Sequence, residues 1–239
     1  MAGSRSLYVE PERPAEDREW AALELIDVFK IYRSGPVETV ALRGLDLRVE
    51  RGELVAVLGP SGCGKSTMLA LAAGLDQPSA GEVRTFGRSL SRAGDGNLAS
   101  YRASDLAIVF QSRNMWPALS AQENVTVSLR LAGHADPESA AEAALEAFGL
   151  ADRRHHRAAA LSGGEQQRVA VAAAAARNAR LVLADEPTGE LDRRNEEVVL
   201  EALKSLKRDH AATVVVVTHS SHVANAADRV IEMRDGRTV

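Results

Sequence analysis

Residues 59–66 form a run whose residue types suit the binding of phosphate. They read Gly-Pro-Ser-Gly-Cys-Gly-Lys-Ser, fit the pattern G-x-x-x-x-G-K-[ST], and are followed by Thr67. Glycines let backbone N–H groups turn inward around phosphate oxygens, and a helix beginning near Lys65 would present its positive dipole end to them. Lys65 can reach the β- and γ-phosphates of a nucleotide, while the Ser66 hydroxyl can ligate Mg²⁺. A glycine-rich turn is the alternative. The run follows a predicted buried strand and opens a predicted helix, which favours a nucleotide-binding loop.

Two adjacent acids end a second run, which is apolar. Leu181–Ala184 is a predicted buried strand, and Asp185 and Glu186 follow it directly. Carboxylates at the end of a buried strand are costly unless they meet a cation or water there. Because side chains alternate along a strand, we expect the two acids to point to different sides. Asp185 would then hold Mg²⁺, and Glu186 would orient and deprotonate an attacking water. A solvated acid pair at a helix start is the alternative, and the phosphate-binding run favours the hydrolytic interpretation.

A third run, residues 161–168, reads Leu-Ser-Gly-Gly-Glu-Gln-Gln-Arg. Ser162 and Glu165 fit a capping box, so this run predicts the start of an alanine-rich helix. Two glycines in the first turn of a helix are unfavourable for helix formation. They make sense if a ligand must approach this helix N-terminus closely, and a phosphate is the natural candidate.

The elements that must position these runs alternate strand and helix. Strands of alternating polarity at Leu23–Phe29 and Leu45–Val49 predict a half-exposed antiparallel layer. A Gly-punctuated loop is expected around residues 94–96. The alternation of strands and helices in the last third of the chain implies a parallel sheet. The strands expected in the core are Leu54–Leu58, Leu181–Ala184, Thr213–Val217 and Arg229–Met233.

The predicted fold class is therefore α/β: a P-loop NTPase core with a mainly parallel sheet, an N-terminal antiparallel β layer and an inserted α-helical subdomain. The helical subdomain is expected at about residues 88–178, where helices interrupt the alternation. Residues 1–21 are expected to form a flexible N-terminal extension, and residues 22–239 a single domain.

Taken together, the three runs resemble the nucleotide-binding subunits of ABC transporters. The resemblance covers roughly residues 22–239, and the motifs occur in the order of that family. It implies an ATP-hydrolysing subunit that uses ATP and Mg²⁺ and pairs head to tail with a second copy or a homologous ATPase subunit. The Ser162–Glu165 segment of one subunit would then close over ATP held by Lys65 of the other.

A narrower resemblance concerns two further segments. Residues 184–192 read Ala-Asp-Glu-Pro-Thr-Gly-Glu-Leu-Asp, and residues 122–125 read Gln-Glu-Asn-Val. Both look like the branch that contains the lipoprotein-release, macrolide-efflux and cell-division ATPases. This branch implies a partner with few transmembrane helices, and mechanical work across the membrane.

The family resemblance also gives roles to residues outside the three runs. Tyr32 resembles the aromatic residue that stacks on adenine, although it could simply be an aromatic at a strand edge. Gln111 resembles the glutamine that contacts Mg²⁺ and the attacking water. Asp192 matches a loop that crosses the dimer interface, and His219 resembles the histidine that contacts the γ-phosphate. Ser220 departs from the family, where an Asp is frequent at this position.

The predicted site consists of three overlapping sets of residues. The catalytic set is Lys65, Gln111, Glu186 and His219. The metal-binding set is Ser66, Gln111 and Asp185. The nucleotide-binding set is Tyr32, Gly59, Pro60, Ser61, Gly62, Cys63, Gly64, Lys65, Ser66, Thr67, Gln111, Ser162, Gly163, Gly164, Glu165 and Asp192.

Composition limits the other functions that the chain could have. A formal net charge of −4 without a basic stripe gives no reason to expect a nucleic-acid partner. The one cysteine excludes an internal disulfide and fits a reducing compartment. The longest apolar run, Val169–Ala176, is too short to span a bilayer, as is Val214–Val217, and Met1–Trp20 lacks the apolar region of a secretory signal. The resemblance therefore implies a separate integral membrane permease and a place on the cytoplasmic face of the inner membrane.

Two alternatives to a transport subunit are compared with these features of the sequence: an ABC protein that acts on nucleic acid or ribosomes, and a regulatory scaffold. ABC proteins that act on nucleic acid or ribosomes usually carry two ATP cassettes, long coiled coils or zinc-binding cysteines, and the sequence has none of these. In a regulatory scaffold, ATP-driven pairing would control an enzyme outside the cell, and this stays open at the level of sequence. Met115, Trp116 and Pro117 either pack on the helical subdomain or line a groove for a short helix of the membrane partner.

Overall fold

The structure, a computed structural model, describes residues 20–35, 37–111 and 114–239. The predicted N-terminal extension, residues 1–21, lies outside these ranges except for Trp20 and Ala21. These two residues belong to the folded domain, because Ala21 is 1% exposed and the Trp20 carbonyl accepts a hydrogen bond from Arg51 Nε at 2.9 Å. Within the described ranges, no helix has the length and apolar character needed to cross a bilayer.

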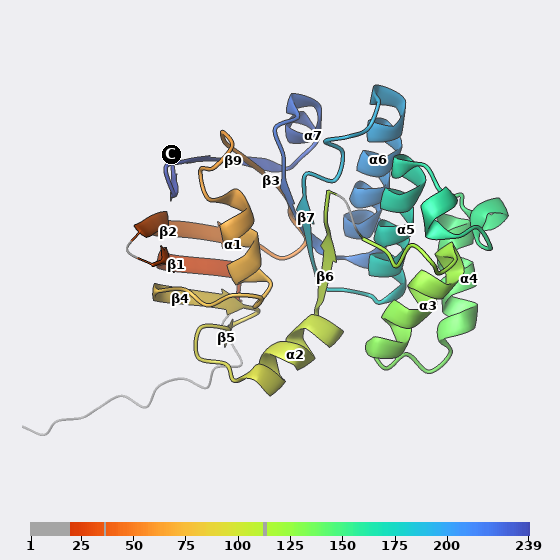
Figure 1. The fold of residues 1–239 in the computed structure, drawn as a ribbon, viewed down its shortest axis with the longest axis horizontal. Helices are drawn as coiled ribbons and strands as arrows, with labels where there is room; N and C mark the ends of the chain where they lie inside the picture. Colours follow the sequence, from red (N-terminus) through yellow and green to blue (C-terminus); the bar gives the residue numbers. More distant parts are fainter. Residues whose placement is uncertain (1–19, 36, 112–113) are drawn as a thin grey trace, which may run out of the picture.

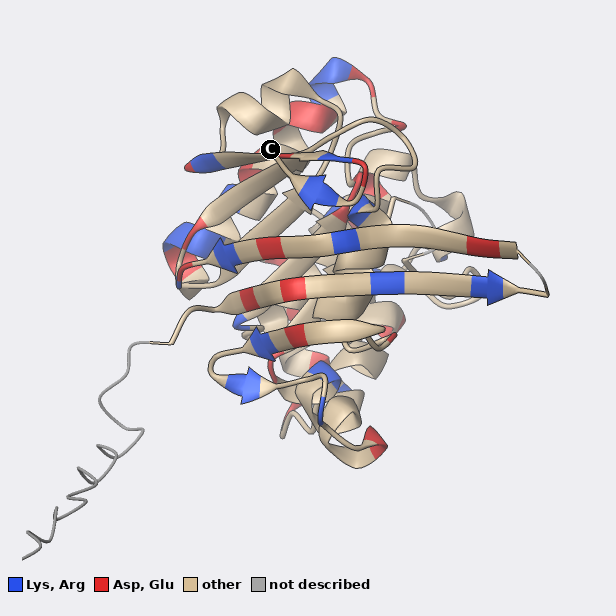
Figure 2. Cartoon of the chain, turned by 90° about the vertical axis from the view of Figure 1, so that its left-hand side faces the viewer, with Lys and Arg blue, Asp and Glu red and all other residues tan. Residues whose placement is uncertain are grey.

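An antiparallel sheet forms one end of the molecule (Figure 1). Its strand order is β2-β1-β4-β5, with β1 at Leu23–Ser34, β2 at Val37–Val49, β4 at Ala80–Thr85 and β5 at Arg88–Ser89. Figure 2 shows basic and acidic residues interspersed along the long strands β1 and β2. This sheet confirms the predicted antiparallel layer, and both long strands extend beyond the segments that showed clear alternation.

A six-stranded sheet with the order β10-β9-β3-β8-β7-β6 runs through the centre of the domain. All neighbouring pairs are parallel except the β9–β10 hairpin. The strands are β3 (Leu54–Leu58), β6 (Leu106–Val109), β7 (Leu181–Asp185), β8 (Thr213–Val217), β9 (Arg229–Arg234) and β10 (Arg237–Thr238). The mainly parallel core predicted from the sequence is confirmed.

The central strands are apolar throughout because helices and the second sheet cover both of their faces. In β8, Val215 and Val217 pack toward α1 (Lys65–Ala72) and the antiparallel layer. The alternate residues Val214 and Val216 pack toward α5 (Gly163–Ala176) and α6 (Arg193–His210) on the other face. The two-residue period of a strand thus feeds two separate cores.

Part of the segment predicted as a helical insertion belongs to the central sheet instead. β6 pairs in parallel with β7, with Leu106 opposite Leu181. This strand cannot be recognised from the sequence, because four apolar residues carry too little periodicity to reveal a partner 75 positions away.

The loop expected around residues 94–96 is in fact the start of helix α2, Asp95–Ser104. Tertiary packing overrides the two glycines here. The Tyr101 ring is buried and its hydroxyl donates to the Ala72 carbonyl at 2.8 Å, while Arg102 donates to the Gly74 carbonyl at 2.7 Å. These contacts fasten α2 to the end of α1.

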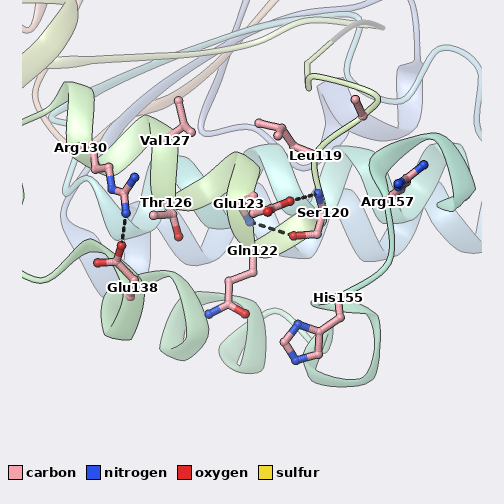
Figure 3. A pocket seen from close by; sticks show the side chains of 11 residues that line it. Leu119, Ser120, Gln122, Glu123, Thr126, Val127, Arg130, Glu138, His155 and Arg157 are labelled. Carbon is pink, nitrogen blue, oxygen red and sulfur yellow. Dashed lines mark hydrogen bonds and ion pairs between the residues drawn. The ribbon is translucent and has the colours of Figure 1, made fainter.

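Helices α3 (Ala121–Leu131) and α4 (Pro137–Ala147) pack with α5 at the end of the molecule opposite the antiparallel sheet (Figure 1). Two short 3₁₀ turns, η2 (Ala151–Arg153) and η3 (Ala158–Ala160), connect α4 to α5. Figure 3 shows the reciprocal hydrogen bonds between Ser120 and Glu123 that begin α3. Both predicted capping boxes are present, at α3 and at α5.

Candidate nucleotide site

A pocket of about 520 Å³ lies at the carboxyl ends of four neighbouring parallel strands. The phosphate-binding run follows β3, Asp185 ends β7 and Glu186 follows it, His219 follows β8, and Gln111 follows β6. Because these strands are adjacent in the order β3-β8-β7-β6, the fold brings their ends together at one edge. The lining residues are Thr39, Val40, Ala41, Gly59, Ser61, Gly62, Gly64, Lys65, Ser66, Thr67, Gln111, Asp185, Glu186 and His219.

The phosphate-binding loop requires glycine at position 64 for a local reason. Gly64 has a φ of +105°, and a Cβ at this position would lie 2.6 Å from the Ala41 carbonyl oxygen. The loop therefore packs closely against β2 and leads directly into α1. Lys65, only 9% exposed, donates to the carbonyls of Gly59 at 2.6 Å and Pro60 at 3.0 Å. An ammonium has three donors, so one remains for an anion in the pocket.

Asp185 is held in a partly buried position beside Ser66. Burial raises the pKa of the Asp185 carboxyl, and the neighbouring Glu186 carboxylate raises it as well. A hydrogen bond from Ser66 and the Lys65 ammonium act in the opposite direction without cancelling the rise. The carboxylate therefore has an unfavourable environment that an additional cation would relieve.

Glu186 lies beyond the regular part of the strand. Its φ is +47°, an unusual value for a non-glycine residue, and its N–H donates to the Val217 carbonyl at 2.9 Å. The strand alternation consequently stops before Glu186, and both acids line the same pocket. The expectation that the two side chains point to different sides stays a prediction, because lining one pocket does not fix the direction of either side chain.

His219 pairs directly with Glu186. Its Nδ1 lies 2.9 Å from Glu186 Oε2, and its backbone N–H donates to the same oxygen at 3.3 Å. Ser220 then begins α7 (Ser221–Asn225) as its N-cap, accepting from Val223 N and donating to Glu196 Oε1 at 2.6 Å. Helix capping thus fixes the backbone immediately after His219, although the family's frequent Asp is missing at position 220.

Gln111 reaches the pocket from the opposite side. It is exposed, and its Nε2 donates to Glu190 Oε1 at 3.4 Å. A Cβ added at Gly189 would lie 3.3 Å from this amide nitrogen. The segment after β7 therefore lies against the glutamine side chain.

Several predicted residues lie outside the pocket lining. Pro60 and Cys63 belong to the phosphate-binding loop, but Cys63 is buried and faces the core. Tyr32 is 41% exposed, and its hydroxyl donates to Asp76 Oδ2 at 3.0 Å beneath the Lys30 ammonium. Its cross-strand partner Thr39 does line the pocket, so Tyr32 stands at the pocket's edge.

The Ser162–Glu165 segment is also absent from the pocket lining, as is Asp192. Asp192 caps α6, where it accepts from Asn195 N at 2.9 Å and from Asn195 Nδ2 at 3.0 Å. A Cβ at Gly164 would lie 2.8 Å from Asn195 Oδ1, so a larger residue here would have to displace the Asn195 side chain. Packing against Asn195 thus accounts for the glycine at position 164. Of the two glycines in the first turn, Gly163 is the one without a close contact.

Sequence reasoning missed the part of the site that β2 supplies. Thr39, Val40 and Ala41 line the pocket, yet their segment carries no motif. They reach the pocket because β2 crosses over the phosphate-binding loop, and only the close approach of Gly64 to Ala41 reveals this.

Two further cavities lie near the helices. One, of about 770 Å³, is open and polar, is bordered by Arg130, Glu138 and His155, and holds none of the predicted site residues (Figure 3). The other is a narrow groove of about 180 Å³ between β6, α3 and α5, and Met115, Trp116, Leu131 and Ala173 are among its lining residues. The two interpretations of Met115 and Trp116 are therefore compatible, because Met115 packs on the helical core while both residues line a groove.

Comparison with known proteins agrees with this geometry. The family described as ABC transporter matches residues 42–189. The chain is 42% identical over 219 residues to the lipoprotein-releasing system ATP-binding protein LolD of Geobacter metallireducens, covering 91% of this chain and 97% of that protein. It is 43% identical over 217 residues to the macrolide export ATP-binding/permease protein MacB of Wolinella succinogenes, covering 90% of this chain but 34% of that longer protein.

A solved structure shows the same fold. The dimeric, post-hydrolysis structure of the ATP-binding cassette MJ0796 bound to ADP and Pi superposes with a TM-score of 0.84 at 37% identity. The superposition covers 90% of this chain and 96% of that one. The phosphate-binding loop, the paired acids and the whole topology thus have one common explanation: the chain belongs to the ABC transporter family, as an ATP-hydrolysing nucleotide-binding subunit.

Proposed function

We propose that the chain binds ATP with Mg²⁺ and hydrolyses it in a head-to-tail pair, and that this cycle drives a separate integral membrane permease. The observation that carries the proposal is the pocket, where the ends of β3, β7 and β8 bring together Lys65, Ser66, Asp185, Glu186 and His219. The Ser162–Glu165 segment lies outside it, as a segment that serves another copy's site should.

The side chains at the pocket fit a magnesium ion. Ser66, Asp185 and Gln111 offer oxygen atoms, which Mg²⁺ prefers, and the raised pKa of Asp185 reflects a burial cost that a cation offsets. Bound Mg²⁺ would neutralise charge on the β- and γ-phosphate oxygens. Lys65 would add a second positive charge to the same oxygens.

Hydrolysis follows from the remaining side chains. Glu186 accepts a proton from the attacking water and holds that water in line with the γ-phosphate. His219, already bound to Glu186 Oε2, is placed to contact a γ-phosphate oxygen, and Gln111 orients the water from the other side. Adenine would stack on the exposed face of Tyr32 at the pocket's edge.

Pairing completes the site in this proposal. The N-terminus of α5 presents free N–H groups and a positive dipole end, which suit a γ-phosphate bound to the second subunit. Gly163, with no close neighbour of its own, lets that phosphate approach. Asp192 would lie at the same interface, and the dimeric state of the MJ0796 cassette supports this arrangement.

The membrane partner would dock at the groove beside β6. Trp116 is 53% exposed and Leu131 is 71% exposed there, which suits a short amphipathic helix. The LolD relative is named as the ATP-binding protein of a releasing system and is matched over 97% of its length, which supports a permease on a separate chain. The chain would therefore act on the cytoplasmic face of the inner membrane, and α3 to α5 would form the subdomain that receives the permease.

The test of the proposed hydrolysis is Glu186→Gln in the purified chain. ATP binding should persist, since the loop and Lys65 are intact, while turnover should fall by roughly 10²-fold or more because the base is gone. Glu197→Gln on the exposed face of α6 is the matched control and should keep wild-type turnover. Near-normal ATP turnover in Glu186→Gln would refute the assigned role.

A further inference from the structure

Residues that line two different cavities follow one another closely between β6 and α3. Gln111 lines the nucleotide pocket, and Met115 and Trp116 line the groove beside β6. β6 ends at Val109, so the polar backbone groups of Phe110 and Gln111 have no strand partner from the sheet. Two side-chain amides, from Asn114 and Gln167, bind these groups instead.

Gln167 lies on α5 and is 4% exposed. Its Nε2 donates to the Phe110 carbonyl at 2.9 Å and to the Gln111 carbonyl at 2.6 Å. Its Oε1 accepts from Asn114 Nδ2 at 3.0 Å. Both amide hydrogens and the amide oxygen of Gln167 are therefore engaged with Phe110, Gln111 and Asn114, which ties these three residues to the helix.

Asn114 closes the arrangement from within the segment. Its Oδ1 accepts from Phe110 N at 2.7 Å, and its Nδ2 donates to the Phe110 carbonyl at 2.7 Å. The side chain thus pairs with both backbone groups of Phe110, as a neighbouring strand would. Gln167 ties this closed unit to α5.

We propose that Gln167 is a positioning residue, which holds Gln111 at a fixed distance from the N-terminus of α5. The inference rests on the role of Gln111 in the proposed function. Gln167 lies about one helical turn after Gly163, in the first turns of α5, whose N-cap is Ser162. Because α5 is one rigid element, movement of its N-terminus toward a second subunit's ATP carries Gln111 with it in the chain's own pocket. Gln167 therefore links the two ATP sites of a pair through one chain.

If Gln167 had a purely structural role, its hydrogen bonds would be the same, but its substitution would change only the stability of the fold. The two are separated by a double-mutant cycle on turnover. Gln167→Met keeps the length of the side chain and removes both donors, and Gln167→Glu keeps the acceptor while losing the donors. Either variant should leave the affinity for ATP near the wild-type value and lower kcat by roughly tenfold, since small displacements of a positioned group carry costs of this size.

The decisive comparison is made in the Gln111→Ala background. If Gln167 acts through Gln111, Gln167→Met should lower kcat there by less than about twofold. Gln166→Met is the matched control, because Gln166 Nε2 also donates to two carbonyls, those of Ala158 and Leu161, both at 3.1 Å. Gln166→Met should change kcat by the same factor in the wild-type background and in the Gln111→Ala background. Melting temperatures measured on the same samples confirm that each variant is folded.

Two outcomes would overturn the inference, and they differ in reach. An equal loss of kcat from Gln167→Met with and without Gln111 would refute the positioning role and leave the proposed function intact. Wild-type kcat in Gln111→Ala alone would remove the role of Gln111 from the proposed function, and the positioning role would fall with it.

Discussion

At the scale of single residues, Asp185 carries an electrostatic cost that its neighbours only partly relieve. Burial raises the pKa of its carboxyl, and the Glu186 carboxylate adds to the rise. In the proposed function this cost is the counterpart of a cation site, a pattern common where charge is needed for chemistry.

Asp185→Asn should therefore stabilise the isolated chain while abolishing turnover. The amide keeps the acceptor for Ser66 and removes the desolvated negative charge. We expect the melting temperature without nucleotide at pH 7 to rise by about 2–4 °C, the shift typical of about 1 kcal/mol in a chain of this size. A matched thermal scan of both proteins checks this, and a lower melting temperature for Asp185→Asn would contradict the account.

The pH dependence of that gain has a definite sign. A carboxyl whose pKa is higher in the folded state binds its proton more tightly there. Wild-type stability therefore falls as pH rises from the ordinary pKa of 3.8 to the higher pKa of the folded state. The advantage of Asp185→Asn should be full above the folded pKa of Asp185 and vanish below its ordinary value of 3.8. An advantage that stays constant from pH 7 to below that value would show a cause other than ionisation.

Residue types alone predicted much of the site, and geometry supplied the rest. Lys65, Ser66, Asp185 and Glu186 could be found from motif and context, because phosphate and metal chemistry restrict the choice of side chains. The backbone conformation of Glu186 could not be predicted in this way. Its φ of +47° accompanies a hydrogen bond from Glu186 N to the Val217 carbonyl, which belongs to another strand.

At the scale of elements, the first turn of α5 separates two reasons for glycine. Gly164 packs against Asn195, which also binds Asp192, whereas Gly163 has only an ordinary contact with Leu191 at 3.4 Å. One glycine thus serves the fold and the other is available to a ligand.

The two glycines should respond differently to alanine. Gly164→Ala forces Asn195 away and disturbs the cap of α6, so the free energy of unfolding should fall by about 1–3 kcal/mol. Gly163→Ala should be neutral or stabilise by up to about 1 kcal/mol, since alanine is the better helix former. Denaturant titrations of both variants measure the difference. Equal effects of the two substitutions would show that Asn195 does not make position 164 special.

Elements with local signals were predicted well, and those with distant partners were not. The capping boxes at Ser120 and Ser162 are formed by residues three positions apart, and both are present. β6 depends on pairing with β7, and α2 depends on bonds from Tyr101 and Arg102 to the end of α1. Such contacts leave little trace in a local stretch of sequence.

At the scale of the whole molecule, the domain divides its functional surface between two places. The pocket at the strand ends holds Lys65, Asp185 and Glu186, and the N-terminus of α5 lies outside that pocket. In the proposed head-to-tail pair, twofold symmetry would join each pocket to the other subunit's α5. The central claim is therefore that neither subunit has a complete site alone.

Complementation between two inactive variants tests this claim most directly. Lys65→Ala removes the phosphate-binding charge from a subunit's own pocket. Gly163→Asp keeps the α5 helix, because an acid is favoured at a helix N-terminus, but repels a phosphate bound by the partner. Each variant alone should hydrolyse ATP negligibly.

An equal mixture of the two should recover about a quarter of wild-type turnover, because half of the pairs are mixed and each mixed pair has one intact site of two. Turnover that stays at the level of the separate variants across mixing ratios, or full activity of Gly163→Asp alone, would contradict the shared site.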